Sequence, residues 1–82
     1  MIPLSSIKFK EIEDYLQSKK FVGLFASKRK HTIVYTFERY YNSTRKMSVK
    51  IKVMRKTKYV ASVKIKDNIF VDFDELKTEI EK

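Results

Sequence analysis

Between residues 47 and 66 the sequence alternates twice between apolar and polar side chains, and this pattern limits the fold more than any other. Apolar residues stand at every second position of 47–54 and again of 59–66, with lysine or serine at most positions between them. Successive side chains of a strand point to opposite faces of its sheet. The pattern therefore predicts two antiparallel strands, joined by the short polar loop 56–58, with one apolar and one basic face.

The rest of the chain supplies further strands and a helix at each end. Apolar spacing predicts a first helix over 5–19, with Ser5 or Ser6 as its N-cap, and a last helix over 73–81. Asp72 is the expected N-cap of the last helix, and Val71 is expected to pack on Leu76. Strands are expected at 21–26 and 31–41, and a very short one at 69–71. Within 21–26, Gly23 is expected to mark a bulge or a close backbone approach.

These elements predict one α+β domain of 82 residues, α-β-β-β-β-α, with an antiparallel meander sheet over about 21–71 and both helices packed on one of its faces. The buried face is expected to carry Ile33, Tyr35, Phe37, Val49, Ile51, Val53, Ala61, Val63 and Ile65. We call the other face the open face; it is expected to carry Lys50, Lys52, Lys64 and Lys66.

Strand register decides which charges meet on the open face. If the loop 56–58 closes a hairpin, Lys50 lies opposite Lys64 and Lys52 opposite Ser62; a shift by two residues would make the like charges diagonal and reduce their repulsion. On the other side, Glu38 can lie opposite Lys50.

Positive charge is concentrated in the same part of the chain. Residues 28–66 hold 13 of the 19 Lys and Arg residues and only one of the 10 acidic residues. Such a surface favours the phosphate backbone of a nucleic acid, DNA slightly more than RNA and with weak sequence specificity. The candidate contact residues are Lys28, Arg29, Lys30, His31, Tyr40, Arg45, Lys46, Lys50, Lys52, Lys56, Lys58, Lys64 and Lys66.

Other interpretations of the basic surface stay open. It could present cations to an acidic protein partner as a regulator or inhibitor, or be a solvated lysine face with no ligand. An anionic membrane surface is less favoured, because neither helix combines a basic face with exposed apolar residues. The segment 21–26 is apolar on both faces, which leaves a homodimer through a strand edge possible.

Catalysis has little support in the sequence. The chain has one His and no Cys, so we expect neither a metal site nor a cofactor, and a binding protein rather than an enzyme. A small metal-independent ribonuclease of toxin type is the third alternative, with His31 as a weak catalytic candidate. Glu38 lies about 20 Å or more from His31 if both are on one strand, so the two cannot act together.

Three segments show partial resemblances to known families. The element order around 21–66, with a helix at each end, resembles the double-stranded-RNA-binding fold, although the last helix here is acidic. Residues 10–37 resemble small mRNA-interferase toxins, with Arg29-Lys30 in place of the Gly-Ser that precedes their His. Residues 37–41 and the closing helix resemble the single-stranded-DNA-binding transcriptional coactivators. None of these covers the chain, and none assigns it to a family.

The remaining composition bears on location. The absence of Cys fits a reducing compartment, the N-terminus is too short and polar for a signal peptide, and no apolar run is long enough to span a membrane. We expect a cytoplasmic protein. Few Asn and Gln with many Lys, Glu and Ile are compatible with an archaeal or mobile-element source.

Overall fold

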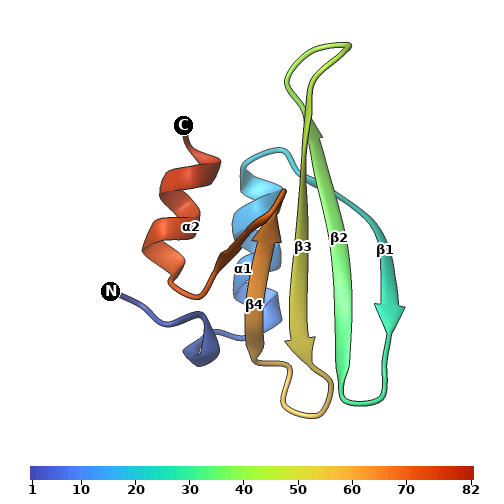
Figure 1. Cartoon of the computed structure of the whole chain (residues 1–82), viewed down its shortest axis with the longest axis vertical. Helices are drawn as coiled ribbons and strands as arrows, with labels where there is room; N and C mark the ends of the chain where they lie inside the picture. Colours follow the sequence, from blue (N-terminus) through green and yellow to red (C-terminus); the bar gives the residue numbers. More distant parts are fainter.

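The computed structural model describes all 82 residues as a five-stranded sheet with two α-helices (Figure 1). In chain order the elements are a 3₁₀ turn Leu4–Ser6, α1 Phe9–Ser18, β1 Val22–Lys28, β2 Thr32–Tyr40, β3 Lys46–Met54, β4 Val60–Ile65, β5 Asn68–Phe70 and α2 Phe73–Ile80.

The strands follow one another in the sheet in the order β1-β2-β3-β4-β5, and every neighbouring pair is antiparallel. This confirms the α+β meander with both helices on one face. The short segment after β4 completes a fifth strand, β5. In Figure 1, β1 lies at the outer edge of the sheet, on the side away from α2.

The first helix begins later than the sequence predicts. Ile7 and Lys8 have extended backbone because Val60 donates its N–H to the Ile7 carbonyl (2.9 Å) and Phe9 donates to the Lys58 carbonyl (2.8 Å). This pairing with the start of β4 separates the 3₁₀ turn from α1. Neither Ser5 nor Ser6 is the N-cap; that position is Lys8, whose side chain makes no capping bond.

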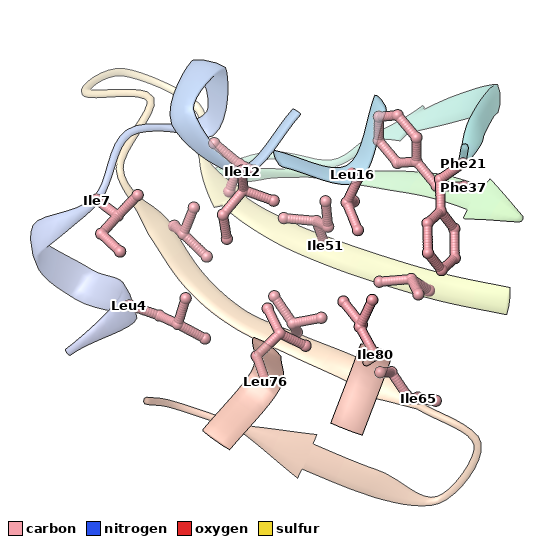
Figure 2. Packing of buried hydrophobic residues seen from close by; sticks show 14 residues of the cluster. Leu4, Ile7, Ile12, Leu16, Phe21, Phe37, Ile51, Ile65, Leu76 and Ile80 are labelled. Atoms are coloured by element: carbon pink, nitrogen blue, oxygen red, sulfur yellow. The ribbon is translucent and has the colours of Figure 1, made fainter. Parts of the chain in front are cut away.

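A single apolar cluster joins the helices to the sheet (Figure 2). Ile12 and Leu16 of α1 and Leu76 and Ile80 of α2 are buried against the strands. The fully buried strand positions alternate with exposed ones along β3, as the sequence predicts. The sheet residues of the cluster are Phe37, Val49, Ile51, Val53, Val60, Val63 and Ile65.

One expected core position in β4 is wrong. Val53 pairs with Val60, whereas Lys52 pairs with Ser62, so Ala61 is an extra residue that shifts the register. Val60 is therefore buried and Ala61 is only half-buried. The bulge adds one residue to the strand and moves the apolar side chain by one position.

Gly23 lies at a second irregularity, as expected. The register of β1 against β2 shifts between Gly23 and Phe25. A Cβ atom on Gly23 would meet the Phe37 ring at 3.3 Å, so the missing side chain allows that ring to pack against the strand.

Two polar side chains fasten the helices to the rest of the fold. Arg39 projects from β2 to the helix side and donates to the carbonyls of Lys19 (2.9 Å) and Ile80 (3.2 Å), at the C-terminal ends of α1 and α2. Its guanidinium also stacks between Phe21 and Tyr41, at 4.8 and 4.7 Å from the ring centres. A cation at a helix C-terminus opposes the partial negative charge of the last carbonyls.

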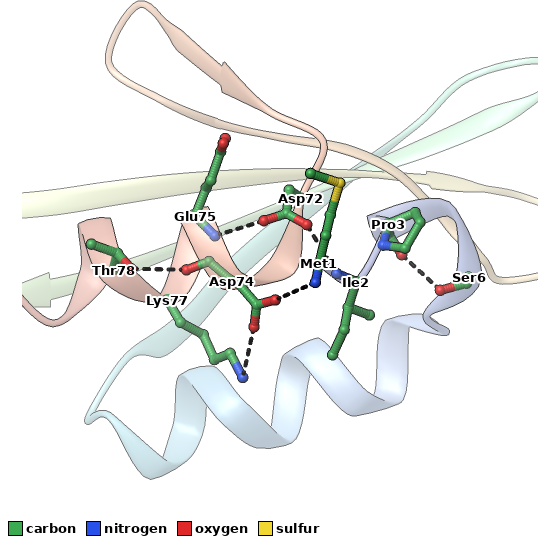
Figure 3. Close-up of polar contacts among 9 residues, drawn as sticks. All are labelled: Met1, Ile2, Pro3, Ser6, Asp72, Asp74, Glu75, Lys77 and Thr78. Atoms are coloured by element: carbon green, nitrogen blue, oxygen red, sulfur yellow. Dashed lines mark hydrogen bonds and ion pairs between the residues drawn. The ribbon is translucent and has the colours of Figure 1, made fainter.

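Asp72 is the second of these side chains (Figure 3). It caps α2 by accepting from the backbone N–H of Glu75 (3.0 Å) and also accepts from the N–H of Ile2 (3.0 Å). The predicted N-cap is confirmed, but the predicted packing of Val71 on Leu76 is wrong. The Val71 carbonyl accepts from the N–H of Leu4, and the Val71 side chain is 63% exposed to solvent.

Replacing Asp72 with Ala should lower the free energy of unfolding by about 1 to 3 kcal/mol, because the cap is lost and the part-buried N–H of Ile2 loses its acceptor. Urea denaturation measures the change. Asp74→Ala is the matched control: its ion pairs with the N-terminus (3.5 Å) and Lys77 (3.8 Å) are exposed, so its cost should stay below about 0.5 kcal/mol. Equal losses in the two variants would contradict the role of Asp72.

Candidate nucleic-acid interface

The open face is the side of the sheet that neither helix covers, and its strand pairing defines its rows. One row crosses all five strands, because Phe25 pairs with Thr36, Thr36 with Lys50, Lys50 with Lys64, and Lys64 with Ile69. The next row runs through Ser27, Val34, Lys52 and Ser62. The predicted register between β3 and β4 is therefore confirmed for the lysines.

A shallow hollow of about 420 Å³ lies over these two rows. We call it the basic hollow; four of its residues are cations and none is acidic. It is lined by Arg29, Thr32, Val34, Lys50, Lys52, Ser62, Lys64 and Ile69.

None of the four cations of the basic hollow forms an ion pair. The seven ion pairs of the structure involve other residues. Lys50 and Lys64 lie directly opposite each other without the register shift that would separate them. Directly opposed like charges are unfavourable. The surface thus concentrates positive charge that no protein carboxylate neutralises.

Two expectations about this face are wrong. Lys66 is not on the strand: it occupies the turn between β4 and β5 with a φ of 55°, because Ile65 already pairs with Asn68. Glu38 lies opposite Ser48 instead of Lys50, and its carboxylate pairs with Lys46 at 3.1 Å. This hydrogen bond and the attraction between the two charges raise the pKa of Lys46.

More cations gather where the β1–β2 turn meets the β3–β4 loop. Arg55 joins these segments, because its guanidinium donates to the Arg29 carbonyl (3.0 Å) and its N–H to the His31 carbonyl (3.0 Å). We call this group the basic end; it comprises Arg29, Lys30, His31, Arg55, Lys56 and Lys58. Arg29 also lines the basic hollow, so the two regions are continuous.

A second hollow, of about 750 Å³, lies near the opposite end of β3 and includes three more of the predicted cations, Arg45, Lys46 and Lys66. It is lined by Tyr41, Asn42, Thr44, Arg45, Lys46, Met47, Ser48, Ile65, Lys66 and Lys82. Most candidate residues therefore divide between two regions. Lys28 belongs to neither, because it pairs with Ile33 in a row whose residues on β2 and β3 are buried on the helix side. Tyr40, 61% exposed, stands near this hollow, opposite Lys46.

The catalytic candidates are not brought together. His31 is exposed in the β1–β2 turn, whereas Glu38 is seven residues further along β2, a separation of about 23 Å on an extended strand. No group of three or more His, Asp or Glu side chains is close enough to hold a metal ion. The structure brings together no acid–base pair around His31.

Sequence reasoning missed some members of the interface. Arg55 belongs to the basic end, and its position within the basic segment 28–66 could have indicated it. Thr32, Val34 and Ile69 line the basic hollow as uncharged neighbours of the lysines, and no charge pattern could have indicated them.

No protein-family model matches the chain, and no curated protein or solved structure is significantly similar to it. The structure contains no helix that is both long and apolar enough to cross a membrane.

Replacing Lys64 with Glu should raise the free energy of unfolding by about 0.5 to 1 kcal/mol, because an attractive pair replaces the opposed lysines. Thermal or urea denaturation measures the gain. Lys52→Glu is the control: Lys52 lies opposite the uncharged Ser62 and should gain less. No gain in Lys64→Glu relative to Lys52→Glu would show that solvent already relieves the repulsion between Lys50 and Lys64.

Proposed function

We propose that this protein binds nucleic acid through the basic hollow and the adjoining basic end. The observation that carries the proposal is the basic hollow, where four unpaired cations line one recess without an acidic residue. The open face is free to meet a ligand, because the helices and the core occupy the other side of the sheet.

The chemistry of the surface suits a phosphate backbone. Lysine and arginine that neutralise phosphates release condensed counterions, which gives affinity that depends little on sequence. The centre of the open face presents lysine, a flexible point charge without the planar fork by which arginine reads guanine. We therefore propose low sequence specificity, with the arginines of the basic end contacting phosphates.

The main test removes three charges from the open face. The triple variant Lys50→Gln, Lys52→Gln and Lys64→Gln should bind DNA and RNA more weakly than the unchanged protein at low salt. The plot of log K against log salt has a negative slope, and each lost phosphate contact reduces its magnitude by about 0.7 to 0.9. The triple variant should therefore have a slope that is shallower by about 2 to 3. Fluorescence anisotropy with single- and double-stranded oligonucleotides over a salt series measures both quantities.

A matched triple variant removes the same charge elsewhere. Lys10→Gln, Lys20→Gln and Lys77→Gln lie outside both the basic hollow and the basic end, and they change the net charge by the same amount. This control should keep nearly all of the affinity and slope. Equal losses of affinity in the two triple variants would show that binding depends on net charge alone and not on the basic hollow. No affinity of the unchanged protein for any nucleic acid at low salt would overturn the proposal.

A further inference from the structure

β1 is an edge strand whose surface is not covered. All seven of its residues are exposed, and it pairs only with β2. Val22 and Phe25 are 62% and 63% exposed, and no charged residue precedes Lys28 in the strand. Native edge strands are usually protected by lysines, prolines, bulges or a covering segment. β1 has the irregularity between Gly23 and Phe25, but it has no proline, no lysine before Lys28 and no covering segment.

The opposite edge of the sheet differs. β5 has only three residues, and the chain that follows it is covered by the N-terminal segment. Pro3 forms a bridge with Asp72, and Leu4 donates its N–H to the Val71 carbonyl at 2.8 Å. The fold therefore protects one edge and leaves the other available.

The register indicates which backbone groups of β1 are free. Arg29 donates its N–H to the Thr32 carbonyl, so this residue is directed towards β2. In an antiparallel pair alternate residues exchange these bonds, so Ser27 and Phe25 are also directed inwards. The N–H and carbonyl groups of Ala26 and Lys28 then point away from the sheet, towards any strand that is added, whereas Leu24 is the extra residue of the irregularity between Gly23 and Phe25.

We propose that two copies of the chain pair through β1 as antiparallel strands, with the twofold axis at Phe25. A twofold contact matches one surface with itself, which suits an uncharged apolar strip on a chain whose net charge is +9. With this axis the two Phe25 rings meet and Leu24 lies opposite Ala26 of the second copy. The two Lys28 residues lie six positions apart, about 20 Å, so their repulsion is small.

This pairing would also enlarge the basic surface. The twofold axis of an antiparallel pair is perpendicular to the sheet, so both copies keep their helices on one side and their open faces on the other. The two basic hollows would then belong to one continuous ten-stranded sheet. The binding consequence rests on the proposed function, whereas the dimer itself does not.

Cysteine cross-linking tests the position of the twofold axis. The chain has no native cysteine, so any disulfide must join the introduced residues. Phe25 occupies a position that does not exchange bonds with the added strand, where opposed Cα atoms lie about 4.5 Å apart, within the range of a disulfide. Phe25→Cys should form a covalent dimer under mild oxidation. Ile69→Cys is the control, because Ile69 is 65% exposed on β5 at the other edge. No cross-link, or equal cross-linking of both variants, would overturn the proposal.

Sedimentation equilibrium without nucleic acid tests the dimer independently. The unchanged protein should approach twice 9.8 kDa with rising concentration, and more readily at higher salt because the like-charged copies are screened. Phe25→Lys should weaken dimerisation about tenfold or more by opposing two charges, whereas Ile69→Lys, with the same added charge, should not. A monomer at all concentrations would overturn the dimer. A dimer that binds no nucleic acid at low salt would overturn only the proposed function.

Discussion

One-sided burial is the constraint on which the rest of this structure depends. Both helices pack on the same face of the sheet, so the apolar residues of β3 and β4 must face them and every intervening residue must face solvent. The lysines of the open face are exposed as a direct result of where the core lies. Because a strand alternates strictly, a change in register by one residue would move these lysines into the core.

The polar contacts that hold the helices on the buried face of the sheet come from residues outside the open face. Arg39 links the C-terminal ends of both helices to β2, and Asp72 links the start of α2 to the N-terminal segment. Arg39 and Asp72 therefore use their charges to bind backbone groups within the fold and do not add to the charge of the open face. The open face can therefore change its charges, even at the opposed pair Lys50 and Lys64, without disturbing what holds the layers together.

The sequence predicted the parts of this fold that follow from periodicity. The alternation of β3 and β4 and the capping residue Asp72 were sufficient for the class, the strand order and the pairing of Lys50 with Lys64. The errors arose where one residue is added or a contact is distant in sequence. The bulge at Ala61 and the turn at Lys66 each break the period, and the late start of α1 depends on hydrogen bonds to residues about 50 positions away.

The candidate interface was predicted only in part, for the same reason. Charge counts along the chain treat every cation alike, but the structure separates them by face. Arg39 is directed to the helix side, where it bonds backbone carbonyls, and Lys46 is paired with Glu38. The lysines at the centre of the open face remain without a carboxylate partner. The strength of the proposal therefore lies in this separation rather than in the total charge, because a cation already paired within the fold has less to gain from a phosphate.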